Sequence, residues 1–361
     1  MGVDELIREG IAKLVDCKDL TQIEVEEIMT EIMSGRTTET QIAAFLTALR
    51  MKVETIKEIT ALASVMRKFC CQIHPNVTSI LVDTCGTGGD SVKTFNISTV
   101  AAFIAAGAGI PIAKHGNRSV TSCCGSADLL ENLGLNLKMT PASVEKSIEE
   151  VGIGFMFAPT FHPASKYAIG PRREIGIRTI FNILGPLTNP ANAKAQLLGV
   201  YEESLTEPLA HVLNSLGVKQ AMVVHGVDGL DEISTLGKTK IALLKNCEIS
   251  TFSIHPEDLG LRAAQKEGIE VSTPEENTQI AFRVLNGQNN NSGGEYDPKR
   301  DIALVNAAAA IYLGEKADTI EEGMTVAKES IRCGAAYKKL KSLIKFSGGS
   351  MLKLEELEKH A

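Results

Sequence analysis

A glycine-rich stretch with short polar side chains lies at residues 82–99 and reads VDTCGTGGDSVKTFNIST. The apolar residues before it and the run VAAFIAAG after it predict a strand, a turn and a helix in that order. Gly86, Gly88 and Gly89 allow backbone conformations that other residues avoid, and they let a bulky anion approach the main chain. Because backbone N–H groups at such a turn bind phosphate, we predict a phosphate site here.

The spacing of these glycines argues against two common nucleotide sites. The stretch has neither the G-x-G-x-x-G pattern of dinucleotide-binding turns nor the Gly-Lys-Ser/Thr ending of a P-loop. Asn96, Ser98 and Thr99 stand at the expected first turn of the helix, where their side chains can meet phosphate or ribose oxygens. The alternative interpretation is an ordinary strand-to-helix turn with capping groups.

Two further strand ends carry polar residues. The run KHGNR at 114–118 follows the apolar IPIA, and the acidic run HGVDGLDE at 225–232 follows AMVV. Ligands of open α/β folds bind at the carboxyl ends of parallel strands, so these ends predict one shared crevice. Asp231 and Glu232 beside a phosphate site suit Mg²⁺, which takes one or two carboxylates together with phosphate oxygens. The alternative for the acidic run is a solvated turn.

These motifs lie within longer segments that cover nearly the whole chain. The segments are DTCGTGGD at 83–90, TFNIST at 94–99, KHGNRSVTSCCGSADLLENLG at 114–134, FAPTFHPASKYAIGPRREIGIRTIFNILGPLTNP at 157–190, HGVDGLDEIS at 225–234 and DIALVNAAAAIYLG at 301–314. Together they resemble the anthranilate phosphoribosyltransferases. The resemblance implies transfer of the phosphoribosyl group from 5-phosphoribosyl 1-diphosphate to the amino group of anthranilate, with release of pyrophosphate, in tryptophan biosynthesis.

The same resemblance implies roles for individual residues, although none is assigned as catalytic. The positions that match phosphoribosyl diphosphate contacts are Gly86, Thr87, Gly88, Gly89, Asp90, Thr94, Asn96, Ser98, Thr99, Lys114, Gly116, Asn117 and Ser126. The positions that match the anthranilate path are Gly86, Asn117, His162, Arg172 and Gly185. The positions that match the Mg²⁺ ligands are Ser98, Asp231 and Glu232.

An arginine suits the carboxylate of anthranilate, because a guanidinium donates two parallel hydrogen bonds to a carboxylate. Arg172 stands at the matching position, and Asn117 is expected to hold the substrate amine or carboxylate. Without the resemblance, Arg172, Arg173 and Arg178 would be interpreted as a basic helix face in contact with solvent.

Other residues leave a structural interpretation open or depart from the family pattern. His115 and His162 are equally compatible with hydrogen-bonded structural histidines. Cys123 and Cys124 occupy a turn where relatives usually carry other residues, and Ser165 stands where a larger side chain is common. These departures concern the shape of the substrate tunnel rather than the class of reaction.

Composition agrees with this interpretation. A chain of 361 residues exceeds one typical core, and 44% hydrophobic residues suffice to fill two domains. The net charge of −7 and the absence of Trp argue against a nucleic-acid surface. The rival functions are a pyrimidine nucleoside phosphorylase, disfavoured by KHGNRS and by the chain length, and a nucleic-acid-binding paralogue, disfavoured by the acidic charge and by the presence of Asn117 and Arg172.

The eight cysteines contain no C-x-x-C pair, which disfavours a zinc site and favours reduced thiols. The N-terminal sequence lacks the basic and apolar regions of a signal peptide, and the most apolar segment is too short to span a bilayer. We therefore expect a cytoplasmic protein without a membrane partner.

The elements that must position these residues fall into two classes. Amphipathic patterns predict helices over residues 1–72, and turn signals separate them from short apolar runs that predict strands of a mostly parallel sheet. The predicted strands are SILV, IPIA, GLNL, IGFMF, AQLLGV, QAMVV, KIALL and STFSI. The polar stretch at 286–301 is expected to be an exposed loop.

The resemblance implies an α/β protein of the nucleoside phosphorylase and phosphoribosyltransferase type, with a small N-terminal helical domain hinged to a larger α/β domain. The helical domain would comprise residues 1–72 and a returning helical segment at about 164–186, and the α/β domain residues 76–160 and 190–361. Members of the family are typically homodimers joined through the helical domain, so a homodimer is expected.

Overall fold

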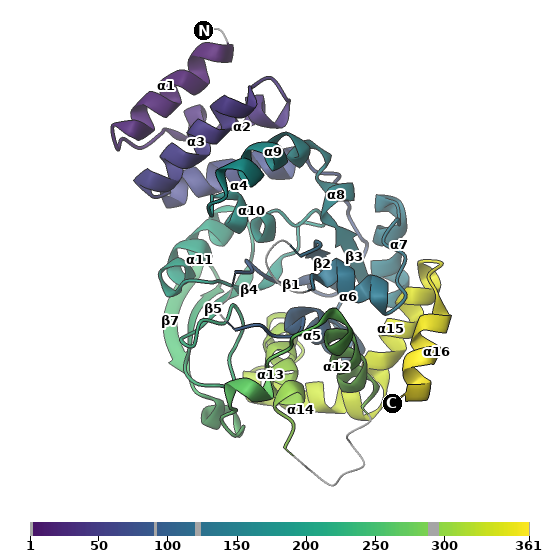
Figure 1. Ribbon diagram of the computed structural model, residues 1–361. Coiled ribbons are helices and arrows are strands. Elements are labelled where there is room, and N and C mark those ends of the chain that lie inside the picture. Colours follow the sequence, from purple (N-terminus) through teal and green to yellow (C-terminus); the bar gives the residue numbers. More distant parts are fainter. Residues whose placement is uncertain (1–2, 90–91, 120–123, 288–295, 361) are drawn as a thin grey trace.

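The computed structural model describes residues 3–89, 92–119, 124–287 and 296–360 of the chain. Figure 1 shows a lobe of N-terminal helices on one side of a sheet and the C-terminal helices on the other. This arrangement confirms the predicted fold class, a small helical domain followed by a larger α/β domain. No helix in the described ranges combines the length and the apolar composition of a membrane span.

The N-terminal lobe begins with four helices, α1 (Val3–Val15), α2 (Gln22–Met33), α3 (Glu39–Lys52) and α4 (Ile56–Phe69). Thr21, Thr38 and Thr55 cap three of them, each accepting a backbone N–H from the first turn. In each case the side-chain oxygen of a Glu or Gln three residues later accepts the backbone N–H of the capping threonine. These bonds satisfy N–H donors that have no partner within the helix.

One of these capping carboxylates also joins the helices to one another. Glu58 is fully buried, and it accepts hydrogen bonds from the backbone N–H of Leu20 at 3.0 Å and from Lys52 Nζ at 2.8 Å. A buried carboxylate is stable only when its oxygens are paired in this way. Glu58 therefore fixes the start of α4 against the α1–α2 connection and the end of α3.

The sheet has the strand order β3-β2-β1-β4-β5-β6-β7. Its strands are β1 (Val82–Gly86), β2 (Ile112–Gly116), β3 (Ile153–Phe157), β4 (Ala195–Gly199), β5 (Gln220–Gly226), β6 (Thr239–Lys245) and β7 (Glu248–Ile254). The pairs from β3 to β5 are parallel, whereas β5–β6 and β6–β7 are antiparallel. Because these strands are parallel, the carboxyl ends of β1, β2 and β4 lie at the same edge of the sheet.

The predicted strand GLNL at 134–137 is wrong, because these residues form the connection between α6 (Ser126–Asn132) and α7 (Pro141–Val151). Gly134 adopts φ +106°, and the backbone N–H of Leu135 bonds back to Leu130 as in a helix-ending turn. Leu135 and Leu137 are nevertheless buried. The apolar run thus fills the core without pairing in the sheet.

Alternating strand residues divide the core between two faces of the sheet. Leu197 and Met222 belong to the buried cluster that includes α5 (Ile97–Gly107), α13 (Pro298–Leu313) and α15 (Ala335–Phe346). Leu198 and Val223 belong to the cluster formed with α4, α10 (Phe181–Leu187) and α11 (Thr206–Ser215). The second cluster continues into the N-terminal helices, so apolar packing attaches the helical lobe to the sheet.

The segment at 164–186 is not one continuous helix. It contains a short 3-10 turn (Pro163–Ser165), α9 (Lys166–Ile175), a non-helical stretch and then α10. Gly176 ends α9 with φ +68°. Helix α9 packs on α3 and α2, and α10 packs on α4, so the whole segment lies against the helical lobe.

The remaining helices complete the C-terminal layer and the connections. They are α8 (Ala158–Phe161), α12 (Pro274–Asn286), α14 (Ile320–Arg332) and α16 (Met351–His360). Of the loop predicted over 286–301, residues 288–295 lie outside the described residues, Asn286 is the last residue of α12, and the residues from Pro298 onward are helical because Asp297 caps α13. Pro at the first helical position and an Asp cap before it explain this start.

Candidate active site

The glycine turn after β1 needs glycine for two different reasons. Gly88 and Gly89 have φ values of +67° and +80°, a conformation that other residues rarely adopt. Gly86 has no such conformation, but a Cβ there would lie 2.3 Å from Asp231 Oδ2. The turn therefore exposes its main chain to the edge of the sheet and lies directly against an acidic residue from the β5 side.

Asp231 and Glu232 join this turn to the start of α5. Asp231 Oδ2 accepts the backbone N–H of Gly88 at 2.7 Å, and Glu232 Oε1 accepts the backbone N–H of Ser98 at 3.1 Å. Both acidic residues are only 8% exposed, and burial raises the pKa of the Asp231 carboxyl. Two neighbouring carboxylates thus lie between the expected phosphate turn and the helix that follows it.

Lys114 brings a buried positive charge to the same place. Its Nζ donates to the carbonyl of Thr84 at 2.6 Å and to Ser98 Oγ at 3.3 Å. Burial lowers the pKa of Lys114, and attraction to the fully buried Asp83 opposes that change. Because an ammonium has three donors, the contacts with Thr84 and Ser98 leave one donor for a ligand.

Asn96 is held by a partner that is distant in sequence. Its side chain donates to the carbonyl of Cys124 at 3.1 Å and accepts from Asn277 Nδ2 at 2.6 Å. Its backbone N–H donates to Asn277 Oδ1 at 3.0 Å. Asn277 lies in α12, and no sequence motif marks it, so the sequence analysis did not find it. Nearby, Thr99 Oγ1 is buried without a hydrogen-bond partner among the described residues.

The other predicted phosphoribosyl contacts lie around the β1 and β2 ends, except Thr94, which forms an isolated bridge with Glu270. Gly116 ends β2, and a Cβ there would meet Ser126 Oγ at 2.2 Å. Ser126 Oγ in turn donates to the carbonyl of Asn117 at 3.3 Å, and the Asn117 side chain is exposed. Asp90 and Cys123 lie outside the described residues.

His115 and His162 form a buried pair whose ring centroids are 4.9 Å apart. Burial lowers the pKa of His115 to about 3 and that of His162 to about 4, so both rings are neutral near neutral pH. The backbone of Gly185 approaches His115. The backbone of Thr188 approaches the His162 ring in the same way, but neither ring nitrogen of His162 makes a well-aligned hydrogen bond to the described residues. This pair leaves polar atoms available beside Gly185.

Arg172 projects from α9 and stacks on an aromatic ring. Its Cζ lies 5.1 Å from the centroid of Phe181, and the side chain is half-buried. Burial lowers the pKa of Arg172. In the part of the chain that the structure describes, no carboxylate lies within ion-pair distance of this guanidinium. A partly desolvated cation without an acidic partner is suited to an anionic ligand.

Arg178 also contacts the glycine turn, although it was not predicted as a site residue. Its Nη2 donates to the carbonyl of Gly89 at 2.7 Å, and its Cζ lies 4.4 Å from the ring centroid of Tyr201. Arg178 is exposed, but it lies outside α9 and is held by these two contacts, so it is not part of a basic helix face. Arg173, in contrast, is exposed.

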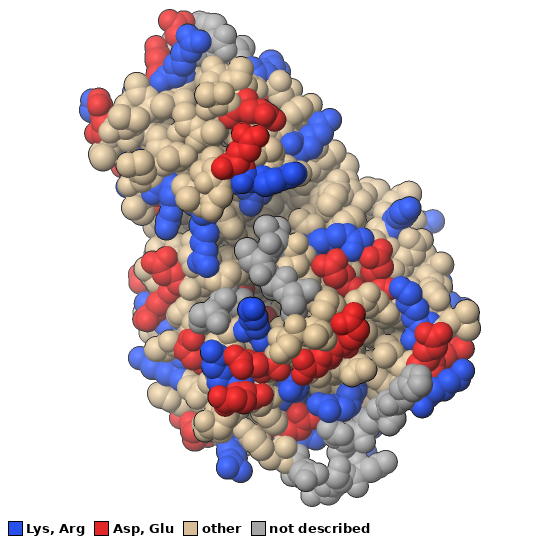
Figure 2. Space-filling view, in the orientation of Figure 1, with Lys and Arg blue, Asp and Glu red and all other residues tan. Residues whose placement is uncertain are grey.

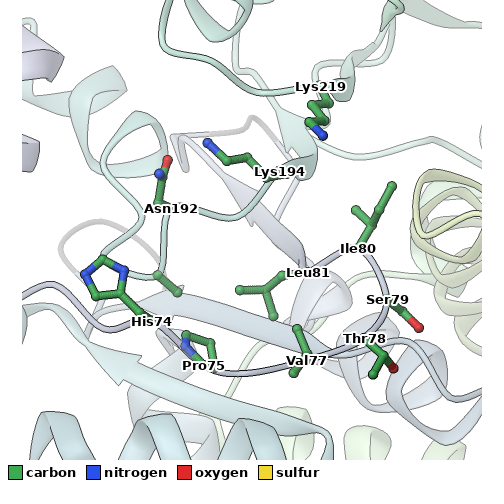
Figure 3. Close-up of a pocket in the computed structure, with 11 residues that line it drawn as sticks. His74, Pro75, Val77, Thr78, Ser79, Ile80, Leu81, Asn192, Lys194 and Lys219 are labelled. Atoms are coloured by element: carbon green, nitrogen blue, oxygen red, sulfur yellow. The ribbon is translucent and has the colours of Figure 1, made fainter.

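A hollow of about 470 Å³ lies elsewhere, at the amino ends of the strands. Leu81, Lys194 and Lys219, which line it, directly precede β1, β4 and β5, whereas the glycine turn follows β1. Figure 3 shows Lys194 and His74 on its rim. None of the predicted site residues lines this hollow.

On the face seen in Figure 2, the described Lys and Arg side chains are interspersed with Asp and Glu rather than forming a basic stripe.

Two family models match the chain. The "Glycosyl transferase family, a/b domain" covers residues 78–337, and the "Glycosyl transferase family, helical bundle domain" covers residues 8–70. An anthranilate phosphoribosyltransferase of Acetivibrio thermocellus is 51% identical over 342 residues, with 95% of this chain and 97% of the relative covered. One of Methanocorpusculum labreanum is 52% identical, with 95% and 99% covered.

Solved structures agree with these relatives. The anthranilate phosphoribosyltransferase of Thermus thermophilus is similar with a TM-score of 0.87 at 38% identity, covering 94% of this chain and 99% of that one. The Saccharomyces cerevisiae enzyme, described in complex with PRPP and Mg, has a TM-score of 0.86 at 29% identity, covering 95% and 98%. The chain therefore belongs to the anthranilate phosphoribosyltransferases of the glycosyl transferase family.

Proposed function

We infer that the protein transfers the phosphoribosyl group of 5-phosphoribosyl 1-diphosphate to the amino group of anthranilate. The products are N-(5-phosphoribosyl)anthranilate and pyrophosphate, and the reaction is a step of tryptophan biosynthesis. The observation that carries this inference is that side chains following or ending β5 and β2 converge by hydrogen bonds on β1, its glycine turn and the start of α5. Asp231 bonds to the turn, Glu232 to the start of α5, and Lys114 to Thr84 and Ser98.

The phosphoribosyl diphosphate is assigned to the glycine turn and the first turn of α5. Backbone N–H groups there, with the positive end of the helix dipole, favour an anion. Lys114 adds a charge that is only 3% exposed, and a buried charge acts strongly on a neighbouring phosphate. The assigned contacts are Gly86, Thr87, Gly88, Gly89, Asp90, Thr94, Asn96, Ser98, Thr99, Lys114, Gly116, Asn117 and Ser126.

Mg²⁺ is assigned to Ser98, Asp231 and Glu232. Among the described residues no group of three or more His, Cys, Asp or Glu side chains gathers as a complete protein site. Mg²⁺ does not require one, because one or two carboxylates with water and phosphate oxygens complete its shell. The adjacent buried pair fits this pattern, and the ion would neutralise charge on the departing diphosphate.

Anthranilate is assigned to the side of the site formed by the helical lobe and the β2 end. Arg172 would hold its carboxylate with two hydrogen bonds, and Asn117 and His162 offer polar atoms without charge. The assigned residues are Gly86, Asn117, His162, Arg172 and Gly185. An aryl amine is unprotonated near neutral pH, so the protein needs no strong base. Its task is to hold the amine in line and to stabilise the leaving group.

A fluorescence assay tests this function. Purified protein is mixed with anthranilate, phosphoribosyl diphosphate and Mg²⁺, and the loss of anthranilate fluorescence is followed. We expect turnover that requires all three components. Phosphate-dependent cleavage of a pyrimidine nucleoside without anthranilate turnover would instead identify a phosphorylase, and nucleic-acid binding without any turnover would identify a binding protein.

Assembly and location are part of the same proposal. We propose a homodimer through the helical lobe, which has exposed apolar side chains at Val15, Ile23, Met51 and Val53. Closed two-fold dimers are the commonest oligomers. We also propose a reducing, cytoplasmic location, because the seven described cysteines are all free. Sedimentation at micromolar concentration tests the first point, and a monomer would contradict it.

A further inference from the structure

We propose that Arg178 is a positioning residue that holds the glycine turn in its diphosphate-binding conformation and links that conformation to the seating of the helical lobe. This proposal rests on the proposed function. It concerns a side chain that no substrate assignment uses, and it names a physical connection between the two parts of the molecule.

The first support is the contact with the turn itself. Arg178 Nη2 donates to the carbonyl of Gly89 at 2.7 Å, and a Cβ on residue 89 would lie 2.9 Å from the same nitrogen. The arginine therefore lies against a residue whose φ of +80° only glycine adopts readily. By donating to this carbonyl oxygen, the Arg178 cation compensates the partial negative charge of the oxygen at the glycine turn.

The second support is the frame that fixes the arginine. Its guanidinium lies over the ring of Tyr201, with Cζ 4.4 Å from the centroid. The backbone N–H of Tyr201 donates to Thr87 Oγ1 at 3.1 Å, and the backbone N–H of Thr87 donates to Gly199 at 3.0 Å. Arg178 and the glycine turn are thus held by the same residues beyond β4. A stacked, planar guanidinium loses little freedom when it forms such a bond.

The third support is where Arg178 stands in the chain. It lies in the stretch between α9 and α10, and these helices pack on α3 and α4 of the helical lobe. Gly89, Thr87 and Tyr201, in contrast, follow strands of the sheet. The contact therefore crosses from the segment that carries Arg172 to the turn assigned to the diphosphate. A shift of that segment would move both substrate contacts together.

An exposed arginine usually contributes little through an ion pair. Arg178 is exposed, but no carboxylate of the described chain lies within ion-pair distance of it. Its contacts are a backbone carbonyl and an aromatic face. We therefore expect loss of Arg178 to make the conformation of the glycine turn less ordered, without changing the overall charge balance or the folding of the protein.

The test compares Arg178→Met, Arg178→Lys, Tyr201→Phe and Tyr201→Leu with the matched control Arg173→Ala, an exposed arginine of the same segment. We measure the KM of each substrate and the Kd of phosphoribosyl diphosphate with Mg²⁺ by calorimetry. Arg178→Met should raise the KM and Kd for phosphoribosyl diphosphate about tenfold, as expected for a lost hydrogen bond to a charged donor, and leave the anthranilate KM unchanged. Lysine should restore only part of the loss, because it keeps the charge but not the planar stack.

Tyr201→Phe should behave as wild type and Tyr201→Leu should resemble Arg178→Met, since only the second removes the stacking face. Melting temperatures should match the Arg173→Ala control. The proposal is overturned if Arg178→Met binds phosphoribosyl diphosphate normally, if both substrates weaken equally, or if lysine restores binding fully. Should the wild type bind phosphoribosyl diphosphate without using anthranilate, the proposed function fails while the calorimetric comparison still decides the role of Arg178.

Discussion

The two sides of the candidate site are built in different ways. On the diphosphate side, Asp231, Glu232 and Lys114 make hydrogen bonds of 2.6–3.3 Å to the turn after β1, to β1 itself and to the start of α5. On the anthranilate side, Arg172 contacts the face of the Phe181 ring, and the His162 ring nitrogens make no well-aligned hydrogen bond to the described residues. The first side is therefore fixed before substrate arrives, whereas the second keeps unused polar groups for the substrate to satisfy.

Substitutions on the two sides should therefore have different consequences. Removing a group from the fixed side disturbs the protein as well as the ligand, because each group is bonded to the turn after β1, to β1 or to the start of α5. Removing a group from the open side affects mainly the ligand that would have used it.

The largest effect is expected from Asp231→Asn with Glu232→Gln. Both changes keep size and remove charge, so Mg²⁺ and the departing diphosphate lose their stabilisation while the fold remains. Turnover should fall by about 10³-fold or more, in the range found when electrostatic groups of an active site are removed. Activity at limiting Mg²⁺ and the melting temperature are measured together. Turnover close to wild type under those conditions would reduce the carboxylates to a solvated turn.

A smaller effect is expected from Asn277→Ala, which leaves Asn96 without its reciprocal hydrogen bonds. The KM for phosphoribosyl diphosphate should rise by about fivefold, equivalent to about 1 kcal/mol for a lost hydrogen bond. The anthranilate KM should not change. Asn214→Ala on α11 serves as the control, since it lies on a helix away from the glycine turn. A loss of similar size in that control would contradict a specific role for Asn277.

A separate effect concerns stability rather than catalysis. The pKa values of His115 and His162 are lowered from 6.5 to about 3 and about 4, so the unfolded chain binds protons more readily than the folded one. The contribution of these histidines to the free energy of unfolding should therefore be at its maximum above pH 6.5 and should fall as the pH is lowered toward 4.

His162→Gln should flatten this pH dependence, because glutamine takes no proton. Chemical unfolding is measured for both proteins across that pH range. The raised pKa of Asp83 and Asp231 acts with the opposite sign, so the comparison between variant and wild type isolates the histidine. Parallel curves for the two proteins would contradict a neutral, buried His162.

Local sequence predicted the parts of the site that local backbone geometry determines. The glycine turn, the polar strand ends and the adjacent carboxylates all follow from short motifs, because each sits at the end of one strand. Asn277 and Arg178 were not predicted, since they meet Asn96 and Gly89 only after the chain folds. The segment GLNL shows the opposite limit, because its apolar pattern signals burial but not strand pairing.

If Arg172 holds anthranilate and Lys114 holds phosphoribosyl diphosphate, loss of either side chain should weaken the binding of one substrate only. The apparent affinities of both substrates are determined in Arg172→Ala and Lys114→Ala. Arg172→Ala should weaken anthranilate by about tenfold to 100-fold, the range for hydrogen bonds to a charged group, and leave phosphoribosyl diphosphate nearly unaffected. Lys114→Ala should do the reverse. Equal losses for both substrates in both variants would contradict the division.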